Sequence, residues 1–248
     1  MNQGYCSVSI SPVRAENRDQ SEIVTQLLFG EVVTVQEIAT PWAKISSMAD
    51  GYEGWIDIKH IKKLSDKEVR RWMEGLDYST DRERLLQTPW GKQWICQGSF
   101  VQADATSFNI GNDNFEWLEE STVSFDDMWS CAESYLNTPY LWGGKSPFGI
   151  DCSGFTQAVY RFFDINLPRD ASQQVLDGAE VDFEDIETGD LAFFHNNKGK
   201  ITHVGILDDQ GHILHASGHV RRDLFTKDGI VHNEHGDITH KLSIIKRW

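Results

Sequence analysis

The sequence predicts an α+β protein in which one or two small all-β barrels precede a larger unit of helices followed by antiparallel strands. Residues 13–61 alternate short β-rich runs with turn residues, and apolar side chains recur at helical spacing from residue 125 onward. The strand-like runs DLAFFH, KITHVGILDD and HILHASG then follow in the last third of the chain. Helices first and strands after are typical of an α+β arrangement. A chain of 248 residues has room for one to three such domains.

The first barrel is indicated by the runs EIVTQLLFGEVVTVQEI, WAKISS and GWIDI, with a turn at Asp50 and Gly51. Short strands joined by tight turns favour an antiparallel barrel of hairpins. Trp42 and Trp55 are expected in its core or at its rim, because aromatic side chains dominate small cores. The order of these runs resembles the bacterial SH3-like domains of cell-wall enzymes, which predicts such a domain over residues 1–62.

The next segment, residues 63–122, carries weaker patterns. Ser65 and Glu68 have the spacing of a capping box, which predicts a short helix. The β-like runs KQWICQGSFVQ and FEWLEES follow, and TPWGKQWI partly repeats TPWAKI of the first barrel. We interpret the segment as a degenerate second SH3-like domain or a linker domain.

The third predicted domain, residues 123–248, opens with two helices. Met128, Cys131, Ala132, Tyr135 and Leu136 recur at helical spacing, with Ser124 as the expected N-cap and Cys131 as a core thiol. A glycine-rich bend, TPYLWGGKSPFG, separates this helix from a second one.

The second helix is predicted over residues 152–163, with Asp151 as its N-cap. Its apolar face is Phe155, Ala158, Val159, Phe162 and Phe163.

Cys152 is the candidate nucleophile, because it lies in the first turn of that helix. Unsatisfied backbone amides and the positive end of the helix dipole favour a thiolate there. Ser153 and Gly154 are small, so little crowds the sulfur. The alternative is a buried structural cysteine at a helix start.

His203 and His215 are the candidate proton carriers, since both lie in apolar, strand-like runs around the turn DDQG. If Leu207 pairs with Gly211, the two histidines face each other directly, whereas a four-residue turn offsets them by one. Each histidine alone is better explained as a satisfied core or edge-strand side chain, and only the combination with Cys152 at a helix start favours the functional interpretation. The remaining histidines are expected at the surface: His60, His195, His212, His219, His232, His235 and His240.

Composition excludes several classes of partner. A formal net charge of −15 and a pI near 4.9 argue against binding of nucleic acid or anionic membranes, both of which need clustered Lys and Arg. Four dispersed cysteines without a CxxC motif indicate neither disulfides nor a thiolate zinc site. The N-terminal residues resemble no signal peptide, and no run reaches the ~20 apolar residues of a membrane span. We therefore expect a cytoplasmic protein, or a secreted one if a signal peptide has been removed.

Five motifs in order, TPYLWGGKSPFGIDCSGF, LPRDASQQ, ETGDLAFF, ITHVGI and LHASG, resemble those of the NlpC family of bacterial cell-wall cysteine peptidases. The resemblance implies a papain-like core, in which a cysteine at a helix start faces histidines on an antiparallel sheet. It further implies Cys152 as nucleophile, His203 as general base and acid, and His215 as the residue that orients His203. No metal or organic cofactor is implied.

The resemblance also implies a substrate, namely murein peptides cleaved between γ-D-glutamate and a diamino acid. In a subgroup with SH3-like domains, the aspartates matching Asp151 and Asp170 help to hold the free amine of an N-terminal L-alanine, as carboxylates can for a buried ammonium. Ser153 is a further expected substrate contact, and the Tyr140 hydroxyl is expected to face substrate or oxyanion. Glu53, in the turn DGYEGW, is expected to assist amine recognition. Tyr140 as a packing residue and Glu53 as a solvated turn residue are the alternatives.

Two other interpretations stay open. The first is a non-catalytic murein-binding protein that uses its SH3-like domains. The second is a zinc enzyme with Cys152, His203 and His215 as ligands. The sequence leaves the oligomeric state undetermined.

Overall fold

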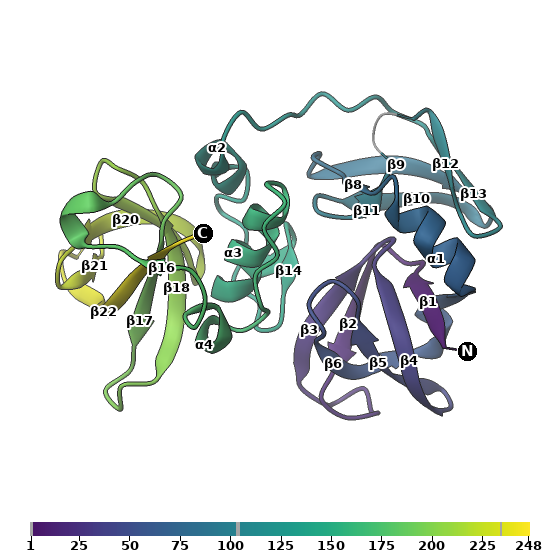
Figure 1. Ribbon diagram of the computed structural model, residues 1–248, viewed down its shortest axis with the longest axis horizontal. Coiled ribbons are helices and arrows are strands. Elements are labelled where there is room, and N and C mark those ends of the chain that lie inside the picture. Colours follow the sequence, from purple (N-terminus) through teal and green to yellow (C-terminus); the bar gives the residue numbers. More distant parts are fainter. Residues whose placement is uncertain (1, 103–104, 234) are drawn as a thin grey trace. The chain divides into compact units, whose positions relative to one another are not determined.

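The chain folds into two compact units, residues 1–124 and 125–248. The computed structural model describes residues 2–102, 105–233 and 235–248. Figure 1 traces the first unit from purple to teal and the second from teal to yellow.

The first unit begins with a seven-stranded antiparallel sheet of order β3-β2-β6-β5-β4-β1-β7. The predicted turn at Asp50 and Gly51 lies between β5 and β6. Gly51 has φ 71° there, a left-handed conformation that glycine adopts readily because it has no Cβ. Trp42 and Trp55 are half-buried. The strands of this seven-stranded sheet are β1 (Gln3–Cys6), β2 (Ile10–Arg14), β3 (Ile23–Leu28), β4 (Val32–Ala39), β5 (Trp42–Ser47), β6 (Glu53–Asp57) and β7 (Ile61–Leu64).

A helix, a four-stranded sheet of order β10-β9-β13-β12 and a two-stranded pair of β8 and β11 complete the first unit. Helix α1 (Asp66–Met73) starts with the predicted capping box, in which Ser65 and Glu68 bond reciprocally. Trp72 of α1 donates its indole N–H to the Gly30 carbonyl at 3.0 Å and stacks on Phe108, so one hydrophobic core joins both sheets. The further strands are β8 (Asp77–Tyr78), β9 (Glu83–Thr88), β10 (Gly91–Cys96), β11 (Phe100–Val101), β12 (Ser107–Ile110) and β13 (Asp113–Trp117).

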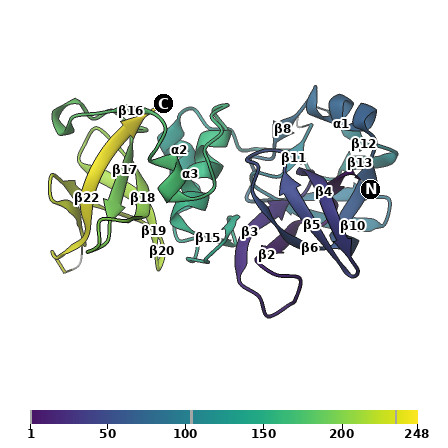
Figure 2. The ribbon, with the colours of Figure 1, turned by 60° about the horizontal axis from the view of Figure 1, so that its bottom comes forward.

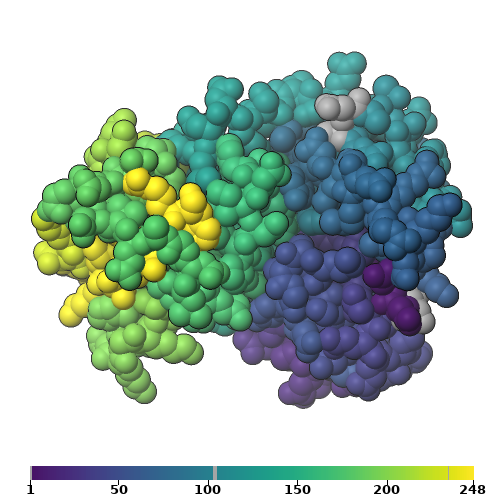
Figure 3. All heavy atoms as spheres, viewed as in Figure 1, coloured from purple at the N-terminus to yellow at the C-terminus, as the bar shows by residue number. Residues whose placement is uncertain are grey.

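The second unit is built on an antiparallel sheet of order β16-β22-β17-β18-β19-β20-β21, and an additional pairing of β21 with β22 closes it on itself. Because β16 pairs with β22, green and yellow atoms adjoin in Figure 3 although they are far apart in sequence. The strands are β16 (Ala179–Glu180), β17 (Leu191–His195), β18 (Ile201–Leu207), β19 (His212–Ser217), β20 (His219–Thr226), β21 (Gly229–Val231) and β22 (Ile238–Arg247).

Helices cover one side of this sheet. Helix α3 (Cys152–Arg161) packs against β18 and β19, and α2 (Met128–Glu133) lies beside α3, as Figure 2 shows. The short helix α4 (Ala171–Gln174) packs against β18, and a small hairpin, β14 (Lys145–Ser146) with β15 (Gly149–Ile150), precedes α3. The expected α+β class and the antiparallel sheet are confirmed.

The predicted helices differ from the observed ones in their caps, ends and burial. Helix α2 is capped by Asp127 and not by Ser124, because Asp127 and Ser130 form a reciprocal capping box. It ends at Glu133, so Tyr135 and Leu136 follow it in a turn. Helix α3 stops at Arg161, and all ten of its residues are buried, not one apolar face alone.

All four cysteines are free thiols and all are buried, Cys131 with no exposed surface. Among the described residues, no helix is long and apolar enough to cross a membrane.

Candidate active site

Cys152 begins helix α3, as predicted, with Asp151 as the N-cap. An Asp151 oxygen accepts the backbone N–H of Gly154 at 2.7 Å. Gly154 is required in this first turn because a Cβ there would lie 2.2 Å from the Gly144 carbonyl oxygen. The helix start is therefore pressed against the glycine-rich bend, which fixes the sulfur in place.

Cys152 is buried, with 7 % of the residue exposed. Burial raises the pKa of the Cys152 thiol to about 12, helped by the Asp151 carboxylate and opposed by the backbone N–H groups of Val204 and Ser153. The expectation that the helix start favours a thiolate was therefore wrong for the resting protein, because desolvation outweighs the helix end. Cys152 rests as a thiol and needs a base.

Asp151 is held by a buried arginine that the sequence analysis did not single out. Arg169, 1 % exposed, donates to the two Asp151 oxygens at 2.9 and 2.6 Å and to the Ser153 hydroxyl at 3.1 Å. With the N–H groups of Gly154 and Gly143 and the Ser153 hydroxyl at 3.4 Å, five donors face this carboxylate. Asp151 thus ties the bend, the helix start and Arg169 together.

His203 and His215 lie on one face of the sheet, but in a different register from either alternative considered. Gly205 pairs with His215, so His203 is offset by two residues from a direct partner. The shift arises because Asp208 pairs with His212 and its side chain accepts the His212 N–H at 2.7 Å, which moves the turn one residue along the chain. The face is unchanged because side chains alternate with period two.

The two imidazoles are directly bonded, with His203 Nε2 and His215 Nδ1 at 2.8 Å. His215 Nε2 continues the chain to a carboxylate oxygen of Asp223 on β20, at 3.0 Å. His203 is 6 % exposed, and His215 and Asp223 are each 1 % exposed. The three residues form a buried diagonal row across β18, β19 and β20.

Burial sets the charge state of this row. It lowers the pKa of His203 well below the usual value, aided by repulsion from His215 and His240, and it lowers the pKa of His215 despite the nearby Asp223 carboxylate. Burial acts to raise the pKa of Asp223, but hydrogen bonds from His215, the Asn233 backbone and Arg221 together lower it. Both histidines are consequently neutral and Asp223 is ionised at neutral pH.

His240 was predicted at the surface, and the structure contradicts this. On β22, its ring stacks on that of His203 with centroids 4.1 Å apart and planes at 23°. Burial lowers the pKa of His240 to about 4. The one available signal was the tripeptide Ile-Thr-His, which precedes a strand-like run both at residues 201–203 and at residues 238–240.

Only two of the seven histidines expected at the surface are exposed there, His219 and His235. The others are half-buried. His60, for example, bonds to Ser11 at 2.8 Å, and His212 pairs with Asp208 at 2.9 Å.

The nitrogens of His203, His215 and His240 lie within 4.8 Å of one another, and Cys152 is not in that group. His203 and His215 each already use one ring nitrogen in the bond between them. The arrangement suits proton transfer better than it suits the Cys152, His203 and His215 zinc set.

The other predicted site residues are distributed over both units. Tyr140, 37 % exposed, lies close enough to Cys152 for its charge to contribute to the raised pKa of the tyrosine hydroxyl, although burial is the larger cause. Asp170 is the N-cap residue of α4, but its side chain makes no capping hydrogen bond. Glu53 is an exposed residue of the first unit, where it accepts from Gln36 and pairs with Lys44 at 3.3 Å.

A pocket of about 290 Å³ opens beside the two stacked histidines. It is lined by Tyr140, Thr202, His203, Ala216, Ser217, Gly218 and His240. This pocket gives a ligand access to the general-base candidate.

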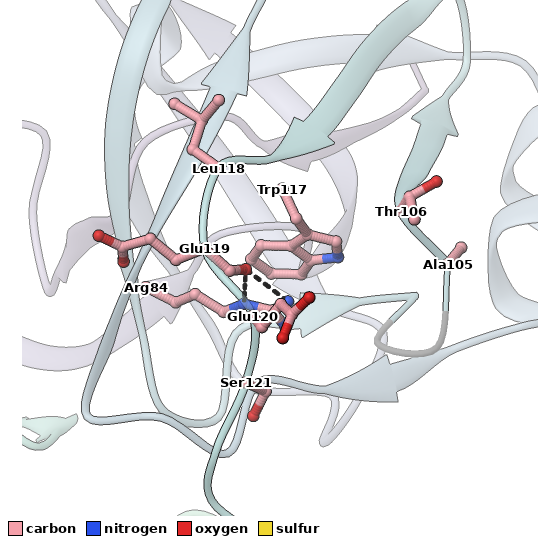
Figure 4. Close-up of a pocket in the computed structure, with 8 residues that line it drawn as sticks. All are labelled: Arg84, Ala105, Thr106, Trp117, Leu118, Glu119, Glu120 and Ser121. Atoms are coloured by element: carbon pink, nitrogen blue, oxygen red, sulfur yellow. Dashed lines mark hydrogen bonds between the residues drawn. The ribbon is translucent and has the colours of Figure 1, made fainter.

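A separate pocket of about 530 Å³ lies in the first unit, between Trp117 and the segment around Thr106 (Figure 4). Arg84 lies under the Trp117 ring at 3.7 Å and donates to the Glu119 carbonyl at 3.0 and 2.8 Å. None of the predicted site residues lines it.

A buried cysteine at a helix start, beside histidines on an antiparallel sheet, defines a cysteine peptidase of the papain-like class. Two family models match the chain, the NlpC/P60 family over residues 137–236 and the bacterial dipeptidyl-peptidase SH3 domain over residues 13–61. The chain belongs to the NlpC/P60 family.

Among similar proteins, the γ-D-glutamyl-L-lysine dipeptidyl-peptidase of Bacillus subtilis (strain 168) is 41 % identical, with 78 % of this chain and 72 % of that protein covered. A protein of the same name from Bacillus cereus is 27 % identical, covering 79 % and 68 %. The crystal structure of an NlpC/P60 family protein from Bacillus cereus ATCC 10987 matches with a TM-score of 0.80 over 99 % of both chains at 21 % identity, which shows the shared fold.

Proposed function

We propose that this cysteine peptidase hydrolyses the bond between γ-D-glutamate and a diamino acid in murein peptides, and that it requires a free N-terminal L-alanine. The observation that carries the chemistry is the diagonal row of His203, His215 and Asp223, together with Cys152, whose sulfur accepts the backbone N–H of Val204, the residue after His203 on β18. The substrate class is supported by the relatives' name, because a dipeptidyl-peptidase releases an N-terminal dipeptide and therefore has to recognise its amine.

In the proposed mechanism, His203 takes the proton of the Cys152 thiol, and the sulfur attacks the γ-carbonyl carbon of D-glutamate. The backbone N–H of Cys152 and the Tyr140 hydroxyl stabilise the oxyanion. His203 then protonates the leaving amine of the diamino acid. A water molecule deprotonated by His203 hydrolyses the thioester, which releases the dipeptide and restores the thiol.

Asp170 is the carboxylate that we propose as the main partner of the substrate ammonium, with Ser153 as a neighbouring contact. Asp151 already accepts from five donors, so its contribution to amine binding is better understood as holding Ser153 and Arg169 in place. A role of Glu53 in amine recognition stays a prediction, as does the cytoplasmic location, which cell fractionation tests.

The test compares L-Ala-γ-D-Glu-L-Lys, its diaminopimelate analogue and the N-acetylated form of each, with products identified by mass spectrometry. We expect wild type to cleave only the free-amine peptides, and Cys152→Ala to cleave none. Asp170→Asn should raise KM with little change in kcat, since it removes a binding contact. Equal cleavage of free and acetylated peptides would refute amine recognition. No cleavage of either, together with binding to whole sacculi, would favour the murein-binding alternative.

His240 offers a pH-dependent prediction. In His240→Ala, water reaches the His203 ring, so the pKa of His203 should rise toward its ordinary value, and the acidic limb of kcat/KM should move to higher pH. His240→Phe keeps an aromatic cover and should leave the limb near that of wild type. Measuring kcat/KM of the three proteins from pH 5 to about 9 tests this prediction. Identical limbs in all three proteins would show that the stacked ring does not set the basicity of His203.

A further inference from the structure

We propose that Asp223 is a positioning residue of the peptidase, which fixes both imidazoles in the tautomer that leaves the Nδ1 lone pair of His203 available to Cys152. This inference deepens the proposed function and rests on it for the reaction only, since the proton arrangement itself is a property of the free protein. The sequence analysis assigned His215 to orient His203 and did not identify Asp223 as a further member of the row.

The geometry of the row supports this role. Asp223 Oδ2 lies 3.0 Å from His215 Nε2, and both side chains are 1 % exposed, so water does not compete for the bond. Asp223 is offset by two residues from Arg221, which pairs with His215, just as His203 is offset from Gly205. Three neighbouring strands thus place one side chain each in a continuous hydrogen-bonded line.

The charge states of the three residues and the two hydrogen bonds determine which ring nitrogens carry the protons. An ionised carboxylate only accepts, so His215 must donate from Nε2. A neutral imidazole carries one proton, and His215 Nδ1 is therefore an acceptor, which receives the Nε2–H of His203 at 2.8 Å. His203 is left with its lone pair on Nδ1, the nitrogen that can receive the thiol proton.

Other groups hold the Asp223 carboxylate in its ionised form. The Arg221 guanidinium donates to Oδ1 at 2.9 Å and lies 2.9 Å from Oδ2 through Nε, and the Asn233 backbone N–H donates to Oδ1 at 3.2 Å. The titratable groups that face Asp223 are thus Arg221 on its own strand, His215 on β19 and His240 on β22. When His203 takes the thiol proton, Asp223 stabilises the resulting positive charge through His215.

Asp223→Asn tests the proposal. The amide oxygen should turn toward Arg221 and Asn233, which puts the amide NH₂ against His215 Nε2 and reverses both tautomers. We expect kcat to fall about 10²–10⁴-fold with little change in KM. Alkylation of Cys152 by iodoacetamide should require a higher pH than in wild type, because His203 becomes a weaker base. A fall in thermal stability alone, without this shift in the alkylation profile, would mean a merely structural role and would overturn the proposal.

The turn between β18 and β19 supplies a matched control. Asp208 pairs with His212 at 2.9 Å but has no link to Cys152. Asp208→Asn keeps the side-chain acceptor of the turn, because asparagine suits such turns as well as aspartate. We expect its kcat and its alkylation profile to match those of wild type.

A measurement on the wild type reports the tautomers without the Asp223→Asn variant. With ¹⁵N-labelled histidine, two-bond ¹H–¹⁵N spectra show which ring nitrogen carries the proton, and His203→Gln and His215→Gln assign the signals. We expect Nε2–H for both residues. A proton on Nδ1 of either would overturn the proposal.

These readouts separate the two levels of inference. Alkylation and the tautomers involve no substrate, so a shifted profile with no cleavage of murein peptides would keep the role of Asp223 and reject the substrate class. Cleavage of those peptides at equal rates by wild type and Asp223→Asn would keep the substrate class and reject the role of Asp223.

Discussion

Replacing His203 by alanine is expected to lower kcat/KM for the free-amine peptide by about 10²–10⁴-fold, the usual contribution of a positioned general base. Burial raises the pKa of the Cys152 thiol to about 12, so almost no thiolate exists at neutral pH unless a base accepts the proton. We propose His203, at the end of the row through His215 to Asp223, as that base.

The pH dependence of the variant distinguishes loss of the base from loss of the fold. Without His203, the rate should follow the thiolate fraction and rise about tenfold per pH unit up to the pKa of the thiol. His212→Ala is the matched control, since His212 belongs to the same hairpin and pairs with Asp208 outside the row. A His203→Ala protein with wild-type kcat/KM, or one whose activity is flat with pH, would refute the assignment.

The parts of the site that the sequence predicted correctly are those determined by neighbouring residues. Asp151 caps the helix that begins at Cys152, and Ser65 with Glu68 caps α1, because a cap depends on residues three positions apart. The common face of His203 and His215 was also predictable, since alternation along a strand does not depend on the turn.

The parts that it missed depend on tertiary structure. The register between β18 and β19 was wrong because the Asp208 side chain bonds to His212 and moves the turn by one residue. Asp223 lies on β20, which pairs with β19, and His240 lies on β22, which is separated from β18 by β17 in the sheet. Apart from the Ile-Thr-His tripeptide shared by residues 201–203 and 238–240, nothing in the sequence next to either residue indicates that it contacts the histidine pair.

The first unit illustrates the same limit. Hairpins over residues 1–62 and a weaker β pattern over residues 63–122 were read from local sequence. The shared core, in which Tyr5 and Phe29 pack with Phe115, joins strands about a hundred residues apart. Apolar alternation shows that such residues are buried but does not show which partner they bury against.

Arg169→Met is expected to destabilise the second unit by about 3–5 kcal/mol, the cost of leaving one partner of a buried ion pair uncompensated. Arg169 and the Asp151 carboxylate are 1 % and 7 % exposed, and their closest contact is 2.6 Å. The remaining donors to Asp151, the N–H groups of Gly143 and Gly154 and the Ser153 hydroxyl, do not neutralise its charge. Hydrogen exchange of the α3 amides, together with urea unfolding, measures the loss.

The double variant Asp151→Asn with Arg169→Met isolates the charge. Asparagine is as good an N-cap as aspartate, so this variant keeps the cap of α3 and removes the unpaired carboxylate. It should be more stable than Arg169→Met alone, because breaking a buried pair costs more than removing it. Lys227→Met, which breaks the exposed pair with Glu184, should leave the unfolding midpoint unchanged. If Arg169→Met unfolded at the wild-type midpoint, the ion pair would not be what fixes the start of α3, and the placement of Cys152 would have to rest on the packing of Gly154 against Gly144.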